Sequence, residues 1–466
     1  MDYQNISVGL DIGTTKIVAI VGRKNEHGKV EILGVGKAKS LGVHRGVVSN
    51  ITQTITSIRE AVDEAERTSG IKIQDVVVGI AGQHIRSLQH NDYITRTNFE
   101  EVIDETDIEK LINQVHKLVM LPGEEIIHVL PQEYKVDGQG EIRGEPIGMF
   151  GRRLEANFHV VVGHVTSIKN IARCVKSAGL NLAGITLEPL ASAEACLGFE
   201  EKEAGVALID IGGGTTDIAI FKDNIIRHTS VIPFGGNIIT EDIKAGCSII
   251  ERQAELLKVK FGSAWPGENP ETEIVSIPGL RGREPKEISL KQLSQIIHAR
   301  VREILEQAYL EIKNYGHEEQ KKKLIAGIVM TGGGANLKHI RQLTEYITGM
   351  DVRIGYPNEH LAGGAGSQEL LSSPEFATGI GLLMKGLENN RIKKLSEEAS
   401  EAEKVVEAIK EKVEETTDFE KPIETVDFDK TEKEDKKKPI KEEKPKGPSF
   451  FESWADKFKK MFDDTE

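Results

Sequence analysis

The chain contains the same strand, glycine turn and strand pattern twice, once near its start and once near its middle. The first copy, VGLDIGTTKIVAIV, covers residues 8–21, and the second, VALIDIGGGTTDIAIF, covers residues 206–221. In each copy an apolar strand ends in an aspartate, and a turn of glycine and threonine leads into a second strand. This repetition predicts an internal duplication, with two similar domains that face each other across one cleft.

Each glycine turn can hold an anion, because glycine lets the backbone approach a ligand closely and point several N–H groups at it. Hydroxyl groups can add donors, and a lysine can meet a phosphate directly. One such turn is a weak signal, since a glycine hairpin often only reverses the chain, but the pair predicts a clamp on a polyphosphate. The residues expected to bind it are Gly13, Thr14, Thr15, Lys16, Gly212, Gly213, Gly214, Thr215 and Thr216.

The aspartates that end the two first strands, Asp11 and Asp210, predict a metal site. Carboxylates are poor ligands for phosphate but good ligands for Mg²⁺, often through water. We therefore expect Mg²⁺ to accompany the polyphosphate.

A third glycine run, IVMTGGGANLKHI, covers residues 328–340 and follows a predicted strand. We expect a helix after it, with Gly332, Gly333, Gly334 and Ala335 beside a nucleoside and its α-phosphate. Glu255 and Lys258, three residues apart on a predicted helix, can bond a ribose; considered alone, they would be read as a surface ion pair.

Strand and helix patterns alternate over residues 1–386, which predicts α/β layers. A helix is expected in residues 104–119, where Thr106 and Glu109 fit a capping box. The strands are expected at residues 6–11, 16–21, 75–81, 158–163, 205–210, 217–221 and 325–331.

Composition excludes several classes of protein. A formal net charge of −14 over 466 residues argues against general nucleic-acid binding. The three cysteines lie far apart, with no CxxC pair, which argues against a disulfide framework or a zinc site. The first residues lack the basic and apolar regions of a signal peptide, and no apolar run is long enough to predict a membrane-spanning helix.

Residues 389–447 are dense in Glu and Lys and contain little that can form a core. Such a segment buries too little apolar surface to offset its ordering entropy, so we expect a disordered linker, with a solvated surface helix as the alternative.

Residues 448–466 differ from the linker because they predict an amphipathic helix that lies in a membrane interface; the alternative is a helix that docks into a groove of a protein. The long tether before it favours the remote, lipid target. One face carries Phe450, Phe451, Trp454, Phe458, Met461 and Phe462, flanked by Lys457, Lys459 and Lys460.

The order of these elements resembles the actin-like ATPase superfamily. Its two phosphate motifs match residues 11–16 and 210–217, and its adenosine motif matches residues 331–335. Its two connecting helices match LEPLASAEACL at residues 187–197 and PEFATGIGLLMKGL at residues 374–387. The resemblance implies duplicated actin-like (ribonuclease H-like) α/β domains around a nucleotide cleft that binds ATP and Mg²⁺.

Within that superfamily the chain is similar to the FtsA family of bacterial division proteins. The segment HVLPQEYKVDGQGEIRGEPIGMFGRRLEANFHVV resembles the α+β subdomain 1C that is specific to FtsA, and the terminal helix resembles its membrane-targeting sequence. The boundaries implied are 1–83, 164–204 and 371–388 for subdomain 1A, 84–163 for 1C, 205–238 and 312–370 for 2A, and 239–311 for 2B.

The FtsA resemblance implies a polymerising protein that tethers the FtsZ ring to the cytoplasmic face of the cell membrane at the division septum. Its implied partners are the C-terminal peptide of FtsZ, further copies of itself, other divisome proteins and anionic lipids. Glu188 matches the position where relatives place a carboxylate near the attacking water, with Asp210 beside it. We therefore expect at most a slow ATPase.

Two other functions fit parts of the pattern. A sugar or metabolite kinase has the same cleft but has no use for a tethered amphipathic helix. A pilus-assembly protein of the PilM type has a similar body and would not need the helix either.

Overall fold

The structure is a computed structural model that describes residues 6–98, 100–142, 144–279, 284–357, 360–363, 370 and 373–392. The predicted linker from residue 393 onward and the whole predicted membrane helix, residues 448–466, lie outside the described residues. The linker's first four predicted residues, 389–392, continue the last described helix instead.

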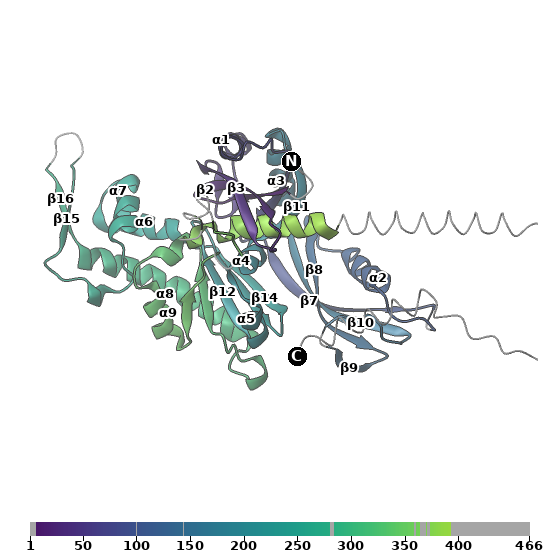
Figure 1. Ribbon diagram of the computed structural model, residues 1–466. Helices are drawn as coiled ribbons and strands as arrows, with labels where there is room; N and C mark the ends of the chain where they lie inside the picture. The colour runs from purple at the N-terminus through teal and green to yellow at the C-terminus, as the bar shows by residue number, and fades with distance from the viewer. Residues whose placement is uncertain are drawn as a thin grey trace, which may run out of the picture. The chain divides into compact units, whose positions relative to one another are not determined.

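The first half of the body is a five-stranded sheet built on the first glycine turn. Strands β1 and β2 form an antiparallel hairpin around that turn, with β3 antiparallel to β2 on one side and β6 and β11 parallel to β1 on the other (Figure 1). The strands are β1 (Ile6–Ile12), β2 (Lys16–Lys24), β3 (Val30–Lys39), β6 (Asp75–Ile80) and β11 (Asn181–Leu187).

The second half repeats this sheet with the same order and the same strand directions. An antiparallel hairpin of β12 and β13 encloses the second glycine turn, β14 extends it on one side, and β17 and β18 follow in parallel on the other. The predicted duplication is therefore confirmed at the level of topology. The strands are β12 (Val206–Ile211), β13 (Thr216–Lys222), β14 (Ile225–Ile232), β17 (Ile328–Thr331) and β18 (Val352–Ile354).

Amphipathic helices cover the outer faces of both sheets. In α1 the side chains of Ile58, Ala61 and Ala65 recur at helical spacing and are buried against the sheet. This helix starts where the Asn50 side chain accepts a hydrogen bond from the backbone N–H of Gln53. The helices of the two halves are α1 (Ile51–Ser69), α3 (Val165–Ser177), α5 (Phe199–Ala204), α6 (Gly236–Cys247), α7 (Glu251–Phe261), α8 (Leu290–Tyr315) and α9 (Ile340–Thr348).

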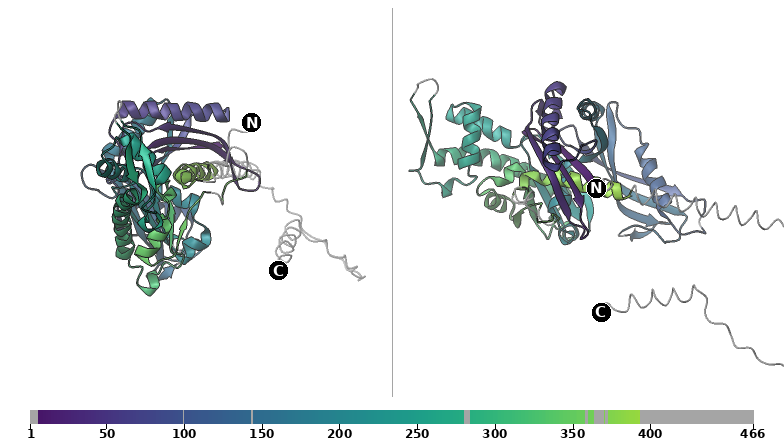
Figure 2. Two further views of the ribbon diagram at one scale, coloured as in Figure 1. Left: turned by 90° about the vertical axis from the view of Figure 1, so that its left-hand side faces the viewer. Right: turned by 45° about the horizontal axis from the view of Figure 1, so that its top comes forward.

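Two helices lie between the sheets and join the halves: α4 (Glu188–Cys196) and the helix of residues 377–392, yellow-green in Figures 1 and 2. They share one hydrophobic cluster with both sheets, in which Ile380 packs with Ile20 from the first sheet and Leu208 from the second. Both predicted connecting helices are thus confirmed.

An inserted domain follows β6 and has its own four-stranded sheet, in the order β7-β10-β8-β9. It also has its own hydrophobic cluster, centred on residues such as Leu111, Leu154 and Phe158. Its elements are β7 (Arg86–Thr95), α2 (Glu105–His116), β8 (Glu124–Val136), β9 (Gln139–Ile142) and β10 (Arg153–His164). Two short hairpins complete the body: β4 (Val43–His44) with β5 (Val47–Val48), and β15 (Ile274–Ile277) with β16 (Lys286–Ser289).

Two local predictions were wrong: the capping box of α2 and the start of β17. Helix α2 is capped by Asp104, whose side chain accepts from the N–H of Asp107, so Thr106 is not the N-cap of a capping box. The short carboxylate of Asp104, two residues before Thr106, is the N-cap because it already accepts a hydrogen bond from that N–H. Strand β17 starts at Ile328 rather than at 325, and a 3₁₀ turn, η5 (Gly333–Asn336), separates it from helix α9.

The crossing of the two joining helices depends on a glycine. A Cβ atom at Gly381 would collide with the backbone carbonyl of Ala191 in α4. Alanine normally favours a helix over glycine by about 1 kcal/mol, so Gly381→Ala would stabilise a free helix. Here we expect the opposite sign, a loss of about 1–3 kcal/mol in the free energy of unfolding, because the helices must move apart. Urea denaturation measures it.

The control is Gly363→Ala, where a Cβ atom meets no described residue within 4 Å. Its free energy of unfolding should change by less than about 0.5 kcal/mol. A Gly381→Ala protein as stable as the parent would show that the helices do not need this contact.

Candidate functional site

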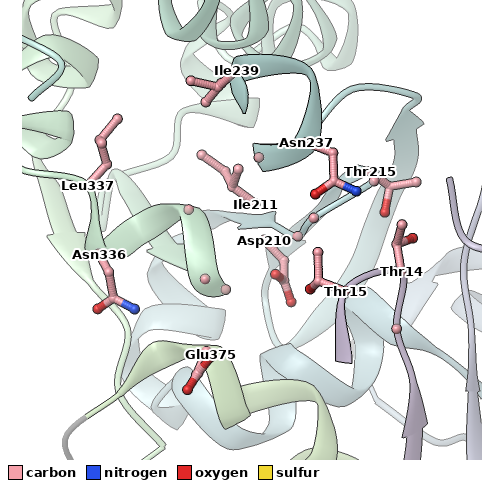
Figure 3. Close-up of a pocket in the computed structure, with 18 of the residues that line it drawn as sticks. Thr14, Thr15, Asp210, Ile211, Thr215, Asn237, Ile239, Asn336, Leu337 and Glu375 are labelled. Carbon is pink, nitrogen blue, oxygen red and sulfur yellow. The ribbon is translucent and has the colours of Figure 1, made fainter. Parts of the chain in front are cut away.

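A cavity of about 480 Å³ lies between the two halves, and all three glycine runs contribute to its wall. Asp11 and Asp210 lie on the same cavity, as the clamp prediction requires. Figure 3 shows Thr14, Thr15 and Thr215 close together beside Asp210. The predicted residues on the wall are Asp11, Gly13, Thr14, Thr15, Lys16, Glu188, Asp210, Gly212, Gly213, Gly214, Thr215, Glu255, Lys258, Gly332, Gly333 and Gly334.

The first two glycine turns touch each other. A Cβ atom at Gly213 would collide with the Thr15 side chain, and one at Gly214 would lie 2.5 Å from Thr14 Oγ1. That hydroxyl also accepts a hydrogen bond of 3.0 Å from the N–H of Gly46. Glycine is needed in the second turn because larger residues would hold the two turns apart.

The third glycine run closes the floor of the cavity beside the Asp210 carboxylate. Gly332 has φ +82° and lies against Asp210 and the backbone of Ile211, so any side chain here would be both strained and blocked. Turn η5 then carries Gly333 and Gly334 along the wall.

Two predicted residues lie elsewhere. Thr216 is fully buried, and its hydroxyl donates to the carbonyl of Phe234 at 2.8 Å, which fixes the start of β13. Ala335 packs in the hydrophobic cluster of the second half. Neither is on the cavity wall, because the alternation of a strand and the tight turn of η5 point these side chains away from it.

Four carboxylates surround the centre of the cavity. Burial raises the pKa of Asp11 to about 6; Lys16 opposes this rise and the charge of Asp210 adds to it. Burial also raises the pKa of Asp210, against hydrogen bonds from Ser192 Oγ at 2.6 Å and Thr378 Oγ1 at 3.3 Å and the charge of Lys16. The carboxylates repel one another and attract a cation.

The remaining two carboxylates belong to Glu188 and Asp217. Glu188 is the first residue of α4, and burial, followed by the charges of Asp11, Asp217 and Asp210, raises its pKa well above the ordinary value. Burial and then Asp210 raise the pKa of Asp217 to about 8, although Thr215 Oγ1 donates to Asp217 Oδ2 at 3.0 Å. The other oxygen of Asp217, Oδ1, is buried without a hydrogen-bond partner.

The two lysines predicted at the site are already paired within the chain. Lys16 Nζ donates to the Glu375 carboxylate at 3.0 Å and to the carbonyl of the same residue at 2.6 Å. Lys258 Nζ lies 2.7 Å from Glu255 Oε2 and donates to the Gly236 carbonyl at 2.8 Å. Both cations therefore stand at the cavity in fixed positions.

Several wall residues were missed by sequence reasoning: Asp217, Gly236, Asn237, Asn336, Glu375 and Thr378. Asp217 stands opposite Asp210 in the hairpin register, a signal that period-2 alternation could have supplied. The backbone N–H groups of Gly236 and Asn237 donate to the carbonyls of Gly212 at 2.9 Å and Gly213 at 2.8 Å. These contacts join segments that no local pattern connects.

The site fits a polyphosphate with a hydrated cation. The glycine turns leave open backbone where a Cβ atom would stand, and the unpartnered oxygen of Asp217 is an acceptor without a donor. Among the described residues, no three or more His, Cys, Asp or Glu side chains converge into a preformed metal-ligand set. A cation here would therefore need water or ligand oxygens to complete its shell.

Two sheets of the same order, joined by two helices around a shared cavity, define the actin-like fold. The chain of the PilM-PilN type IV pilus biogenesis complex has this fold, with a TM-score of 0.59 at 16% identity over 82% of this chain and 98% of that one. MreB5 of Spiroplasma citri, solved with ADP, gives a TM-score of 0.50 at 16% identity over 84% and 98%.

Sequence comparison then names the family. The family model described as "Cell division protein FtsA" matches residues 207–381, and that of the "SHS2 domain inserted in FTSA" matches residues 82–162. The cell division protein FtsA of Pseudomonas aeruginosa is 39% identical over 82% of this chain and 89% of its own length. That of Escherichia coli K12 is 34% identical over 83% and 91%. The chain belongs to the FtsA family of cell division proteins.

The raised pKa of Asp217 makes stability depend on pH. Between the ordinary value of 3.8 and the folded value of about 8, the folded protein keeps a proton that the unfolded chain has released. Stability therefore falls as pH rises through this window. Asp217→Asn removes the charge and keeps an oxygen for Thr215, so we expect it to stabilise the protein by about 1–3 kcal/mol at pH 8 and by little at pH 4.

Urea denaturation of the protein in EDTA, without nucleotide, measures this difference. Asp63→Asn, on the exposed face of α1, is the control and should change stability little at either pH. A gain from Asp217→Asn that is equal at both pH values would rule out the charge as its cause.

Proposed function

We propose that this FtsA-family protein binds ATP with Mg²⁺, assembles with further copies of itself, and tethers the FtsZ ring to the cytoplasmic face of the cell membrane at the division septum. The observation that carries the proposal is the meeting of two glycine turns and four carboxylates at one cavity. The family match favours this function over a sugar kinase or a PilM-type pilus protein.

The size and chemistry of the cavity support a nucleotide. Its volume of about 480 Å³ falls within the range of roughly 300–1,000 Å³ that small-molecule sites have. The phosphates would lie between the turns of residues 13–16 and 212–215, where N–H groups and threonine hydroxyls are available. Mg²⁺ would neutralise Asp11 and Asp210, directly or through water, and polarise the phosphates.

The far end of the cavity suits a nucleoside. Its wall there includes the apolar side chains of Ile239, Leu337 and Ile340, shown in part in Figure 3, which can pack against a base. The Glu255–Lys258 pair lies on the same wall and can bond ribose hydroxyls. The backbone of residues 332–334 would approach the α-phosphate.

Hydrolysis would depend on Glu188, with Asp210 holding the cation-bound water nearby. A carboxylate with a strongly raised pKa can accept a proton from an attacking water near neutral pH. Burial and then the neighbouring carboxylates raise its pKa; a bound cation would offset the charges of those carboxylates, so Glu188 would ionise when substrate and metal are bound. We expect a slow ATPase.

Glu188→Ala tests this role. We expect ATP affinity within about twofold of the parent, because the side chain does not hold the nucleotide, and turnover lowered at least about tenfold, because water loses its proton acceptor. Calorimetric titration with ATP and Mg²⁺ gives the affinity, and phosphate release gives the turnover.

Glu194→Ala, on the same helix but paired with Lys202 at 3.1 Å, is the control and should retain both quantities. Equal turnover in Glu188→Ala and the parent would dismiss Glu188. Absence of ATP binding by the parent itself would dismiss the nucleotide site.

Membrane attachment would come from the amphipathic residues 448–466, outside the described part of the chain. In the described part, no helix combines the length and apolarity needed to cross a bilayer. Burial of several large apolar side chains at ~25 cal/mol per Å² gives the helix its affinity, and lysines near anionic lipid add about 1 kcal/mol each.

Removal of residues 448–466 should abolish sedimentation with vesicles that contain phosphatidylglycerol and leave ATP affinity unchanged, because the body is intact. FtsZ should co-sediment with such vesicles only when the full chain is present, which tests the tether itself.

Phe458→Glu is a milder variant that should lower vesicle binding by about tenfold or more. Undiminished sedimentation of the truncated protein would eliminate the terminal helix as the anchor.

A further inference from the structure

Strand β8 of the inserted domain contacts both halves of the body. Side chains two residues apart on a strand share a face, and His128 and Leu130 follow this spacing. Leu130 packs against the hydrophobic cluster of the first half and also against the cluster between the sheets. We call His128, Leu130, Gln132 and Glu133 the β8 bridge.

The first end of the bridge is fixed beside Glu188. The Nε2 atom of His128 accepts a hydrogen bond of 3.0 Å from the backbone N–H of Leu187, the residue before Glu188. Burial, followed by the charges of Lys385 and His116, lowers the pKa of His128 to about 4. The ring is therefore neutral at physiological pH, and its Nε2 is free to accept. This contact holds the start of α4, where Glu188 enters the cavity wall.

The other end of the bridge holds strand β14 of the second half. Gln132 sits where the register between β8 and β10 shifts, at a bulge that turns its amide outward. Its Nε2 donates to the carbonyl oxygens of Ile226 at 2.6 Å and Arg227 at 3.4 Å. Glu133 pairs with the Arg227 guanidinium at 2.6 Å. Because β14 is an edge strand, these side chains satisfy carbonyls that no further strand covers.

Two neighbouring contacts reinforce this end. His159 Nε2 lies 2.9 Å from Thr229 Oγ1, and Ser87 Oγ donates to the Thr229 carbonyl at 3.1 Å. His159 and Thr229 are buried, so water does not compete for this bond. Three strands of the inserted domain thus hold one strand of the second half.

Strand β14 leads directly into the cavity wall. It ends at Ile232, paired with Thr216, and the chain then reaches Gly236 and Asn237, whose N–H groups bond the carbonyls of Gly212 and Gly213. A displacement of β14 would therefore shift the second glycine turn, because only a few residues separate the two. The opposite end of the same bridge holds Leu187, the residue before Glu188 of the cavity wall.

We propose that the β8 bridge positions the two sides of the cavity relative to each other and limits the opening of the cleft. His128, Gln132 and Glu133 act as positioning residues, because they contact the wall's supports rather than the wall itself. The chain joins the inserted domain covalently to the first half only. Its contacts with β14 are non-covalent, so they can break when the two halves move apart. The effect on nucleotide release rests on the proposed nucleotide binding, whereas the effect on cleft opening does not.

The test uses full-length Gln132→Ala/Glu133→Ala and, separately, His128→Leu. Hydrogen exchange without nucleotide should rise about tenfold at residues 212–216 and 236–247 in both variants, which corresponds to about 1.4 kcal/mol of lost protection. His128 contacts the first half alone, so raised exchange in the second half of His128→Leu is the specific signature of the bridge. Release of a fluorescent ATP analogue should also accelerate about tenfold.

Arg153→Ala/Glu155→Ala is the matched control, because it breaks a 3.0 Å ion pair of the same inserted domain and should leave both readouts unchanged. Exchange that rises only within residues 82–162 or only in α4 would overturn the proposal, as would unchanged nucleotide release in variants with raised exchange. If the parent binds no nucleotide, the proposed function fails, and hydrogen exchange alone decides about the bridge. If the double variant does not fold, His128→Leu decides.

Discussion

The burial of four neighbouring carboxylates, those of Asp11, Glu188, Asp210 and Asp217, is the constraint around which the body of this protein is arranged. Burial raises the pKa of each of them, so the folded state keeps these groups at a cost. The cost is offset by the shared hydrophobic cluster between the sheets and by hydroxyl donors such as Ser192. Such a loss of stability is common at functional sites, and it agrees with the proposed cation and nucleotide site.

The duplication that builds the site is symmetric in topology and asymmetric in charge. Both hairpins enclose four turn residues, 13–16 and 212–215, so Lys16 occupies the place of Thr215. Two residues further on, Val18 stands opposite Asp11, whereas Asp217 stands opposite Asp210. The first hairpin therefore contributes a cation and the second an extra carboxylate. A symmetric scaffold with unequal turns can orient an unsymmetric ligand with a phosphate end and a nucleoside end.

The inserted domain connects to this site through supports rather than through wall residues. Its sheet and cluster are its own, yet one of its strands reaches the start of α4 and the edge strand β14. The inserted domain is thereby connected to both sides of the cavity. These contacts give this chain a physical route by which a change at the inserted domain can act on the cavity.

The sequence by itself determined the α/β class, the duplicated hairpins and about half of the cavity residues, and its resemblance to the actin-like superfamily implied the joining helices. It could do so because glycine turns, apolar strands and helical spacing are local patterns whose geometry depends on adjacent residues alone. It also predicted Asp11 and Asp210 on one cavity, since a repeated turn at the same end of equivalent strands must bring them together.

Only the tertiary structure decided the rest. Thr216 and Ala335 belong to motifs but point away from the cavity, because side-chain direction depends on strand alternation and on the tight turn that follows β17. Lys16 is paired with Glu375, far along the chain, and Asn237 is fixed by the carbonyl of Gly213. The β8 bridge has no sequence signature either. Each of these contacts joins residues distant in the chain, and packing of whole elements, not local propensity, brings such residues together.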